Sequence, residues 1–178
     1  MTNYSGFAET QGSVDASIAT VFDFLDDQAN LSAHMSKSSG MMLGSTMTIR
    51  MEADRTRQIG SAFGFTGSIL GIPLRVDEVV TGREPPKSKT WETTAEPRLW
   101  VIGQYQMGFE LTPSATSSTL RVYIRYNLPR AGLPRLLGWL FGKVYAAWCT
   151  RRMVADAQKH FLARPASAAQ APSEHTAR

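Results

Sequence analysis

The 178-residue sequence has few of the residues that cross-link a chain or bind metal. Cys149 is the single cysteine, which excludes an internal disulfide and a cysteine-ligated zinc site. The histidines show no metal-ligand spacing among themselves or with carboxylates; they are His34, His160 and His175. The sequence also lacks a Gly-x-Ser-x-Gly motif and a glycine-rich phosphate loop. We therefore expect no metal and no cofactor, and no catalytic residue can be assigned.

Long apolar runs are also absent. Residues 1–15 contain no apolar core of the signal-peptide type. The longest apolar stretch, residues 136–149, is interrupted by Lys143 and is too short to span a bilayer. The single cysteine fits a reducing compartment. These features predict a cytoplasmic protein, with a peripheral membrane role left open.

Charge is modest, with a formal net value of +4. The basic residues are spread along the chain, and they do not alternate with aromatic residues as in a nucleic-acid-binding surface, so we expect no nucleic-acid partner. The length favours one domain, which we place at residues 1–163. Residues 164–178 are rich in Ala, Pro and Ser and are predicted to form a disordered tail.

Apolar and polar residues alternate with a period of two through most of the chain. A weak alternation predicts a first strand over residues 7–14, and clearer alternation predicts six more over residues 47–52, 63–69, 74–80, 91–94, 104–111 and 120–126. Six consecutive strands with one apolar face predict an antiparallel meander that is covered on one side.

Two short helical segments follow the first predicted strand. Asp15 is expected to cap the first, which ends at Asp26 and Asp27. Its apolar residues share one side: Ile18, Val21, Phe22 and Leu25. The second segment is predicted over residues 29–35 and contains His34, for which a cap or surface role and an acid–base role are the alternatives.

A long helix is predicted from Pro134 to Leu162. Pro134 suits a first helical position, and Pro165 disfavours helical geometry at the residue before it. One apolar stripe with helical spacing is assigned to the sheet: Trp139, Gly142, Ala146, Cys149, Thr150, Met153, Ala157 and Phe161. The small residues in its middle indicate either a cavity between helix and sheet or close packing without one.

The first half of this helix carries a second apolar face. Its residues are Leu137, Leu140, Phe141, Val144 and Trp148. One sheet cannot cover both faces, so another part of the chain, the partner subunit of a homodimer or a peripheral membrane contact is expected to cover the second.

The element order and several segments resemble the SRPBCC superfamily, the helix-grip proteins that include START domains, birch-pollen-allergen-like proteins and polyketide cyclase/dehydrase-like proteins. Residues 13–16 running into residues 21–25 look like its strand-to-helix entry. Residues 76–80, followed by residues 84–87 and Trp91, are similar to its central hairpin. The resemblance implies an α+β fold in which a seven-stranded antiparallel sheet wraps a long C-terminal helix around a hydrophobic cavity.

We expect this cavity to bind a hydrophobic small molecule or lipid. The predicted lining comes from the apolar sheet face and the helix stripe: Phe63, Phe65, Trp91, Tyr105, Met107, Phe109, Tyr126, Trp139, Ala146, Thr150 and Met153. The alternative is a polyketide cyclase/dehydrase-like enzyme that acts in the same cavity, with Tyr105 or Glu78 transferring a proton. Glu78 either points inward as a costly buried acid or is turned outward by a bulge at Asp77 and Glu78.

Overall fold

The structure is a computed structural model that describes residues 3–31, 46–51, 56–69 and 71–162. The elements within these ranges are β1 (Gly6–Val14), α1 (Ile18–Asp26), α2 (Gln28–Leu31), β2 (Thr46–Met51), β3 (Ala62–Ile69), β4 (Ile72–Glu84), β5 (Ser88–Thr93), β6 (Tyr105–Pro113), β7 (Ser118–Tyr126) and α4 (Gly132–Leu162). Their order is the predicted one. His34 and the predicted tail at residues 164–178 lie outside the described residues.

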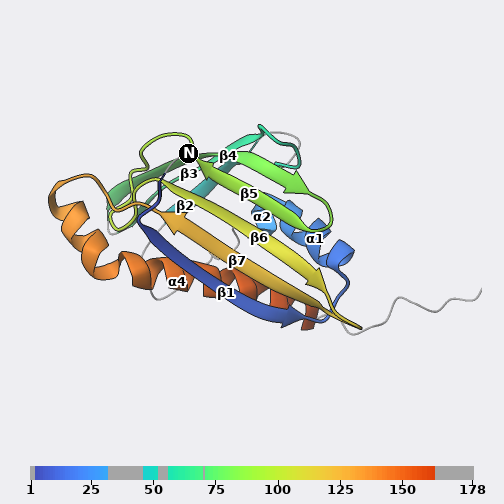
Figure 1. Ribbon diagram of the computed structural model, residues 1–178. Coiled ribbons are helices and arrows are strands. Elements are labelled where there is room, and N and C mark those ends of the chain that lie inside the picture. Colours follow the sequence, from blue (N-terminus) through green and yellow to red (C-terminus); the bar gives the residue numbers. More distant parts are fainter. Residues whose placement is uncertain (1–2, 32–45, 52–55, 70, 163–178) are drawn as a thin grey trace, which may run out of the picture.

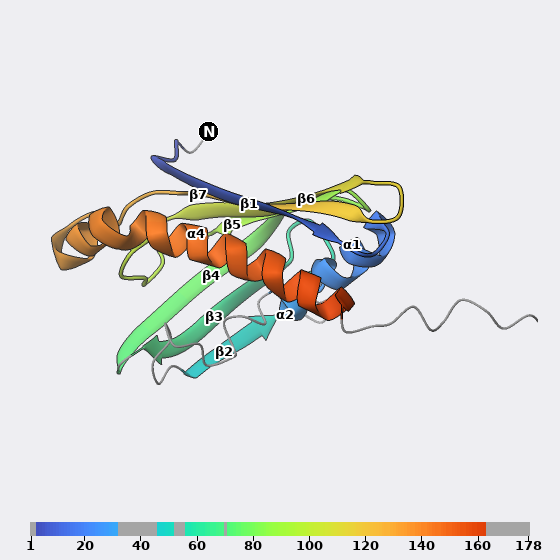
Figure 2. The ribbon, with the colours of Figure 1, turned by 90° about the horizontal axis from the view of Figure 1, so that it is seen from below.

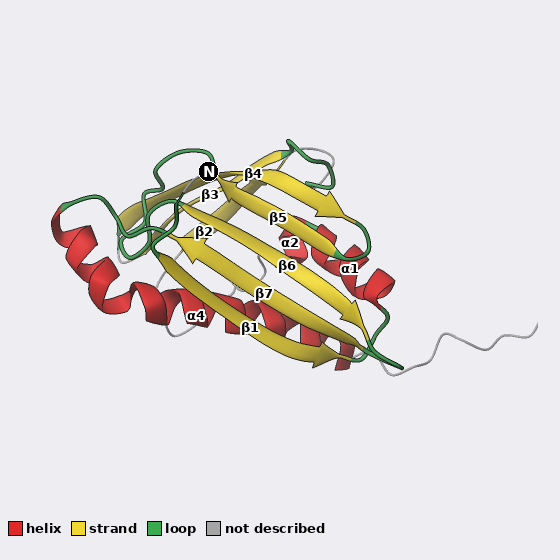
Figure 3. Cartoon of the chain, in the orientation of Figure 1, coloured by secondary structure: helices red, strands yellow, loops and turns green. Residues whose placement is uncertain are grey.

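The seven strands form one sheet in the order β1-β7-β6-β5-β4-β3-β2, and every neighbouring pair is antiparallel. Strands β2 to β7 pair in chain order, while β1 pairs with β7, so the first and last strands lie side by side. The sheet lies over α4 in Figures 1 and 3, and the view from below shows α4 running across its inner face (Figure 2). The predicted helix-grip architecture is confirmed.

The inner face of the sheet carries the core. In β7 the inward set is Leu120, Val122, Ile124 and Tyr126. The residues between them point to the outer face, where Tyr123 is also buried, with the guanidinium groups of Arg121 and Arg125 over its ring. The six aromatic residues assigned to the apolar sheet face are all buried: Phe63, Phe65, Trp91, Tyr105, Phe109 and Tyr126. The alternation was sufficient to predict the buried face, because a strand turns successive side chains to opposite sides.

Helices α1 and α2 cover one end of the inner face. The N-cap of α1 is Ser17, whose hydroxyl accepts a hydrogen bond from the Thr20 backbone N–H at 3.3 Å, so the predicted cap at Asp15 is wrong by two residues. Phe22 of α1 packs on Phe109 of β6, with 5.7 Å between ring centroids. Within the described ranges, each helix is too short or too polar to cross a lipid bilayer.

Helix α4 begins two residues before the predicted Pro134. The predicted stripe is buried from Gly142 to Phe161, but Trp139 is 73% exposed. Gly138 is the buried residue in the preceding turn. The sequence pattern favoured the large apolar residue three positions before Gly142, whereas the packing selects the glycine four positions before it.

The two interior glycines of α4 lie where the helix comes closest to the chain beneath it. A Cβ atom at Gly138 would lie 2.9 Å from the Val101 carbonyl oxygen and 2.8 Å from Pro129 Cδ, and one at Gly142 would lie 3.0 Å from the same oxygen. A side chain at either position would therefore push the helix away from the residue 101 segment.

We expect Gly138→Ala to destabilise the protein, although alanine favours helix by about 1 kcal/mol over glycine. The methyl group would lie within 3.0 Å of a backbone oxygen and a proline ring carbon, so the helix or the chain beneath it would have to shift. Urea unfolding should show a loss of about 1–3 kcal/mol, the usual range for overpacking. A gain in stability would show that the helix N-terminus can shift at no cost.

Candidate functional site

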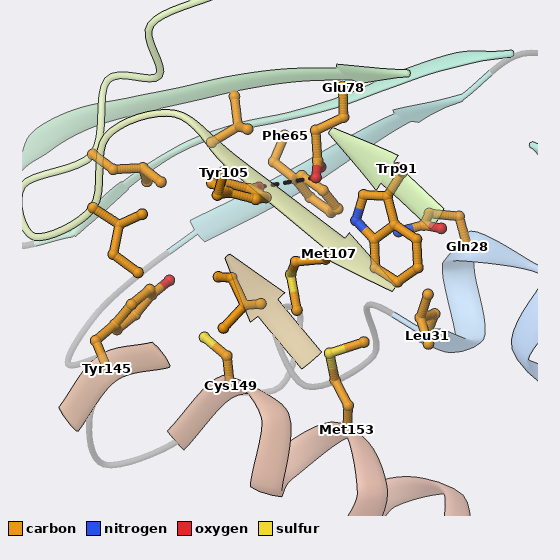
Figure 4. A pocket seen from close by; sticks show the side chains of 14 residues that line it. Gln28, Leu31, Phe65, Glu78, Trp91, Tyr105, Met107, Tyr145, Cys149 and Met153 are labelled. Carbon is orange, nitrogen blue, oxygen red and sulfur yellow. Dashed lines mark hydrogen bonds between the residues drawn. The ribbon is translucent and has the colours of Figure 1, made fainter. Parts of the chain in front are cut away.

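A largely apolar cavity lies between the inner face of the sheet and α4 (Figure 4). Its volume is about 50 Å³, which is room for a few water molecules. Its apolar walls come from the sheet, α2, α4 and the segment between β5 and β6; the residues are Leu31, Phe65, Val76, Trp91, Leu99, Ile102, Met107, Ile124 and Met153. Five further residues complete the lining and bring polar atoms or sulfur to it: Gln28, Glu78, Tyr105, Tyr145 and Cys149.

Glu78 is the only carboxylic acid among these lining residues. It is 2% exposed and follows Leu74 and Val76 on the inward side of β4. The register of β4 against β5 shifts between Val80 and Gly82, so the bulge lies beyond Glu78. The outward orientation considered for Glu78 is therefore wrong, because the strand is regular where the acid occurs.

Two aromatic side chains hydrogen-bond to this acid. The Tyr105 hydroxyl donates to Glu78 Oε1 at 2.9 Å, and the indole of Trp91 forms a second hydrogen bond. Burial raises the pKa of Glu78 to about 8, although both hydrogen bonds act to lower it. Burial, with the nearby acid, also raises the pKa of Tyr105 well above its usual value. Near neutral pH, the site therefore holds a protonated carboxyl beside a protonated phenol.

Helix α4 supplies the opposite wall through Tyr145, Cys149 and Met153, which are spaced four residues apart on one face of the helix (Figure 4). Burial raises the pKa of the Cys149 thiol to about 12. The interaction with that thiol and burial both raise the pKa of Tyr145. Cys149 is thus an un-ionised thiol near neutral pH, which agrees with an inert packing role.

The predicted lining residues fall into two groups. The cavity brings together five of them: Phe65, Trp91, Tyr105, Met107 and Met153. The structure places the other six elsewhere: Phe63, Phe109, Tyr126, Trp139, Ala146 and Thr150. Whether any residue of the first group contacts a ligand stays a prediction.

The second group has clear alternative environments. Phe63 lies at a hollow beside β2, and Phe109 packs under α1. Trp139 is mostly exposed to solvent, so the prediction that it lines the cavity is wrong. Thr150 contacts β1 instead, where its hydroxyl lies 2.9 Å from that of Thr10.

The remaining two are filled core positions. Ala146 is fully buried. Tyr126 lies beneath Gly6, where its ring occupies the space that a side chain would need, and it is within contact distance of Gly142. The rotation of α4 places its small residues Gly142 and Ala146 in close packing, while Tyr145 and Cys149 face the cavity.

Sequence reasoning missed several lining residues. Tyr145 could have been found from its spacing of four to Cys149 and of eight to Met153. Leu99 and Ile102 lie between β5 and β6, where no periodic pattern indicates which side chains turn inward. Among the described residues, no three His, Cys, Asp or Glu side chains gather as a metal site would need.

No protein-family model matches the chain, and no curated protein matches it by sequence. Solved structures do match it. The protein TTHA0849 from Thermus thermophilus superposes with a TM-score of 0.64 at 13% identity, covering 92% of this chain and 100% of its own. Norcoclaurine synthase from Thalictrum flavum gives 0.62 at 12% identity, covering 89% of this chain and 87% of its own. At such identities, the likeness is one of fold alone.

Proposed function

We propose that this chain, which has the helix-grip fold of the SRPBCC superfamily, binds a hydrophobic small molecule or lipid between its sheet and α4. The observation that carries the proposal is the cavity itself, whose walls are apolar except for a small cluster around Glu78. Ligand sites commonly combine apolar walls with a few polar groups that fix orientation.

The polar cluster limits the chemistry of the ligand. With its pKa near 8, Glu78 keeps its proton at neutral pH, and the carboxyl already accepts from the Tyr105 hydroxyl, at Oε1, and from the Trp91 indole. The protonated carboxyl can donate its own proton to a carbonyl, ether or hydroxyl oxygen of a ligand. No lysine or arginine lies among the described lining residues to balance an anion. The site therefore favours an uncharged, mostly apolar molecule with one oxygen acceptor.

The present cavity is smaller than the roughly 300–1,000 Å³ typical of sites for drug-sized ligands. Met107 of β6 and Met153 of α4 line it from facing walls. Methionine side chains are unbranched and adapt readily to a new shape. We infer that ligand entry displaces these two side chains and enlarges the cavity.

Filling the cavity should reduce uptake of the neutral dye Nile red. Cys149→Leu adds volume at the helix wall, where it takes up the space that a ligand needs, so we expect dye affinity to fall by about tenfold, which corresponds to about 1.4 kcal/mol. Dye fluorescence titration measures this. Lys159→Leu is the matched control, because Lys159 is exposed on the same helix and does not line this cavity. Equal affinities in both variants would place the binding site outside this cavity.

A polyketide cyclase/dehydrase-like enzyme is the second candidate. It is favoured by the hydrogen bond between Glu78 and Tyr105 inside one cavity. The pKa of Glu78, about 8, also lies near neutral pH, which is the range that general acid–base catalysis prefers. Native mass spectrometry of protein purified without added ligand would identify a retained molecule. A retained molecule that differs chemically between wild type and Glu78→Gln would favour the enzyme, while the same molecule in both would favour a carrier.

A further inference from the structure

The first turns of α4 carry a large exposed apolar surface. It consists of six side chains, each between 50% and 73% exposed, which we call the apolar face of α4: Leu133, Leu136, Trp139, Leu140, Phe141 and Val144. These turns extend past the ends of β1 and β7 at one end of the molecule (Figure 2). Leu137 and Trp148, which were predicted to belong to the same surface, are half-buried and less exposed than these six. Such a surface marks a contact site, since side chains of this size gain roughly 1.5–3 kcal/mol each on leaving water.

The charges along this stretch of the chain all have one sign. Residues 130–152 contain no Asp or Glu, and their basic residues are Arg130, Arg135, Lys143, Arg151 and Arg152. A surface hollow next to Val144 is lined by Trp148, Arg151 and Arg152. The apolar face thus continues directly into a hollow where Arg151 and Arg152 can meet an anionic group, although Arg152 Nε also lies 3.5 Å from Asp156 Oδ1.

We propose that the apolar face of α4 docks on an anionic lipid bilayer. Its aromatic and aliphatic side chains enter the interface, and Arg151 and Arg152 bind lipid phosphate in the hollow beside Trp148. A second copy of the chain fits less well, because a two-fold axis through this face would bring Arg135, Lys143 and Arg151 of both copies together. The other two cations pair within the chain, Arg130 with Glu96 at 3.4 Å and Arg152 with Asp156 at 3.5 Å.

This docking surface adjoins the cavity. The Trp148 ring stacks on that of Tyr145, with 6.0 Å between centroids, and Tyr145 is a cavity-lining residue. A bilayer against Trp148 would therefore lie one aromatic layer from the proposed ligand. The docking proposal does not depend on ligand binding in the cavity, since neither the apolar face of α4 nor Arg151 and Arg152 line the cavity.

Vesicle flotation tests the docking. The wild type should float with vesicles of equal parts phosphatidylcholine and phosphatidylglycerol and bind phosphatidylcholine alone more than about tenfold less tightly, because each basic residue near an anionic surface adds attraction. The double variant Phe141→Glu, Val144→Glu should lose at least about tenfold in affinity. Arg151→Gln with Arg152→Gln should chiefly lose the preference for the anionic vesicles.

The matched control is Phe7→Glu with Ile59→Glu, two exposed apolar residues on other parts of the chain that should leave flotation unchanged. Absence of flotation by the wild type, or an equal loss in this control, would overturn the proposal. So would a wild-type dimer in sedimentation that Phe141→Glu dissociates, because a second copy would then cover the face. Nile red titration of the same variants reports on the cavity separately, so failure of one proposal leaves the other testable.

Discussion

Raising the pH from 5 to 8 is expected to destabilise the wild-type protein by about 1.4 kcal/mol per pH unit through Glu78 alone. The carboxyl has an ordinary pKa of 4.5 and a folded-state pKa of about 8 because it is buried. Between these values the unfolded chain has lost this proton and the folded chain keeps it. Unfolding then releases a proton, so a higher pH favours the unfolded state. Below about pH 4.5 both states are protonated and the penalty is absent.

Glu78→Gln should remove this dependence. An amide of the same shape can still accept from Tyr105, and it has no proton to lose. Between pH 5 and pH 8 the wild type should lose roughly 3–4 kcal/mol that the variant keeps, because the slope falls off as the pH nears either pKa. Urea unfolding of both proteins at several pH values between 5 and 8.5 measures the difference.

The matched control for this experiment is Glu84→Gln, since the Glu84 side chain is 70% exposed and lies 3.7 Å from the exposed Lys87 ammonium in a weak ion pair. Its stability profile should run parallel to that of the wild type. Parallel profiles for Glu78→Gln as well would mean that Glu78 is ionised in the folded protein, and the assignment of a protonated acid to the cavity would be withdrawn.

Replacing Lys89 is expected to give the largest loss of stability from a single charge-removing substitution. The Lys89 side chain is completely buried, and its ammonium group donates to the Asp26 carbonyl oxygen at 2.6 Å and to Thr56 Oγ1 at 3.2 Å. It also lies 3.3 Å from Asp26 Oδ1, while Arg83 donates to the same carboxylate. This cluster joins the C-terminal end of α1 to β4 and β5.

Lys89→Met would remove the ammonium donor of the buried Asp26 carbonyl oxygen and one of the cations at the Asp26 carboxylate, where Arg83 and, at 4.0 Å, Arg57 would remain. Breaking a buried pair in this way costs about 3–5 kcal/mol, a large part of the roughly 5–15 kcal/mol that stabilises a typical domain. Urea unfolding checks this. Lys87→Met is the control, because Lys87 is 66% exposed and the change should stay within about 0.5 kcal/mol.

A double-mutant cycle of Lys89→Met with Asp26→Asn measures how much of the loss comes from the ion pair between Lys89 and the Asp26 carboxylate. If Lys89 acts through Asp26, the double variant should be less unstable than the sum of the two single variants. Simple additivity would show that the Asp26 carboxylate is energetically independent of Lys89. The loss would then come from the Asp26 carbonyl oxygen, Thr56 and the packing around residue 89, all of which Asp26→Asn leaves in place.

The sequence predicted the fold well because period-two alternation and helix signals are local properties. Strand β7 is an example, since its inward residues could be read directly from the pattern. The site was predicted less well because it depends on rotation and register. A one-residue difference on α4 places Tyr145 in the cavity and Ala146 in the packed core. Nor could the pattern show that Lys89 is buried, because lysine is normally a surface residue and its partners lie on α1 and in the segment before β3.

The pairing of β1 with β7 has a consequence for synthesis of the chain. Gly6 pairs with Tyr126, and β1 also packs against α4, so the first strand made has partners that are made last. At roughly 5–20 residues per second, β1 waits on the order of 6 to 25 seconds before β7 leaves the ribosome. Its sequence, GFAETQGSV, suits that interval, because its glycines and polar residues make it a poor seed for aggregation with other nascent chains.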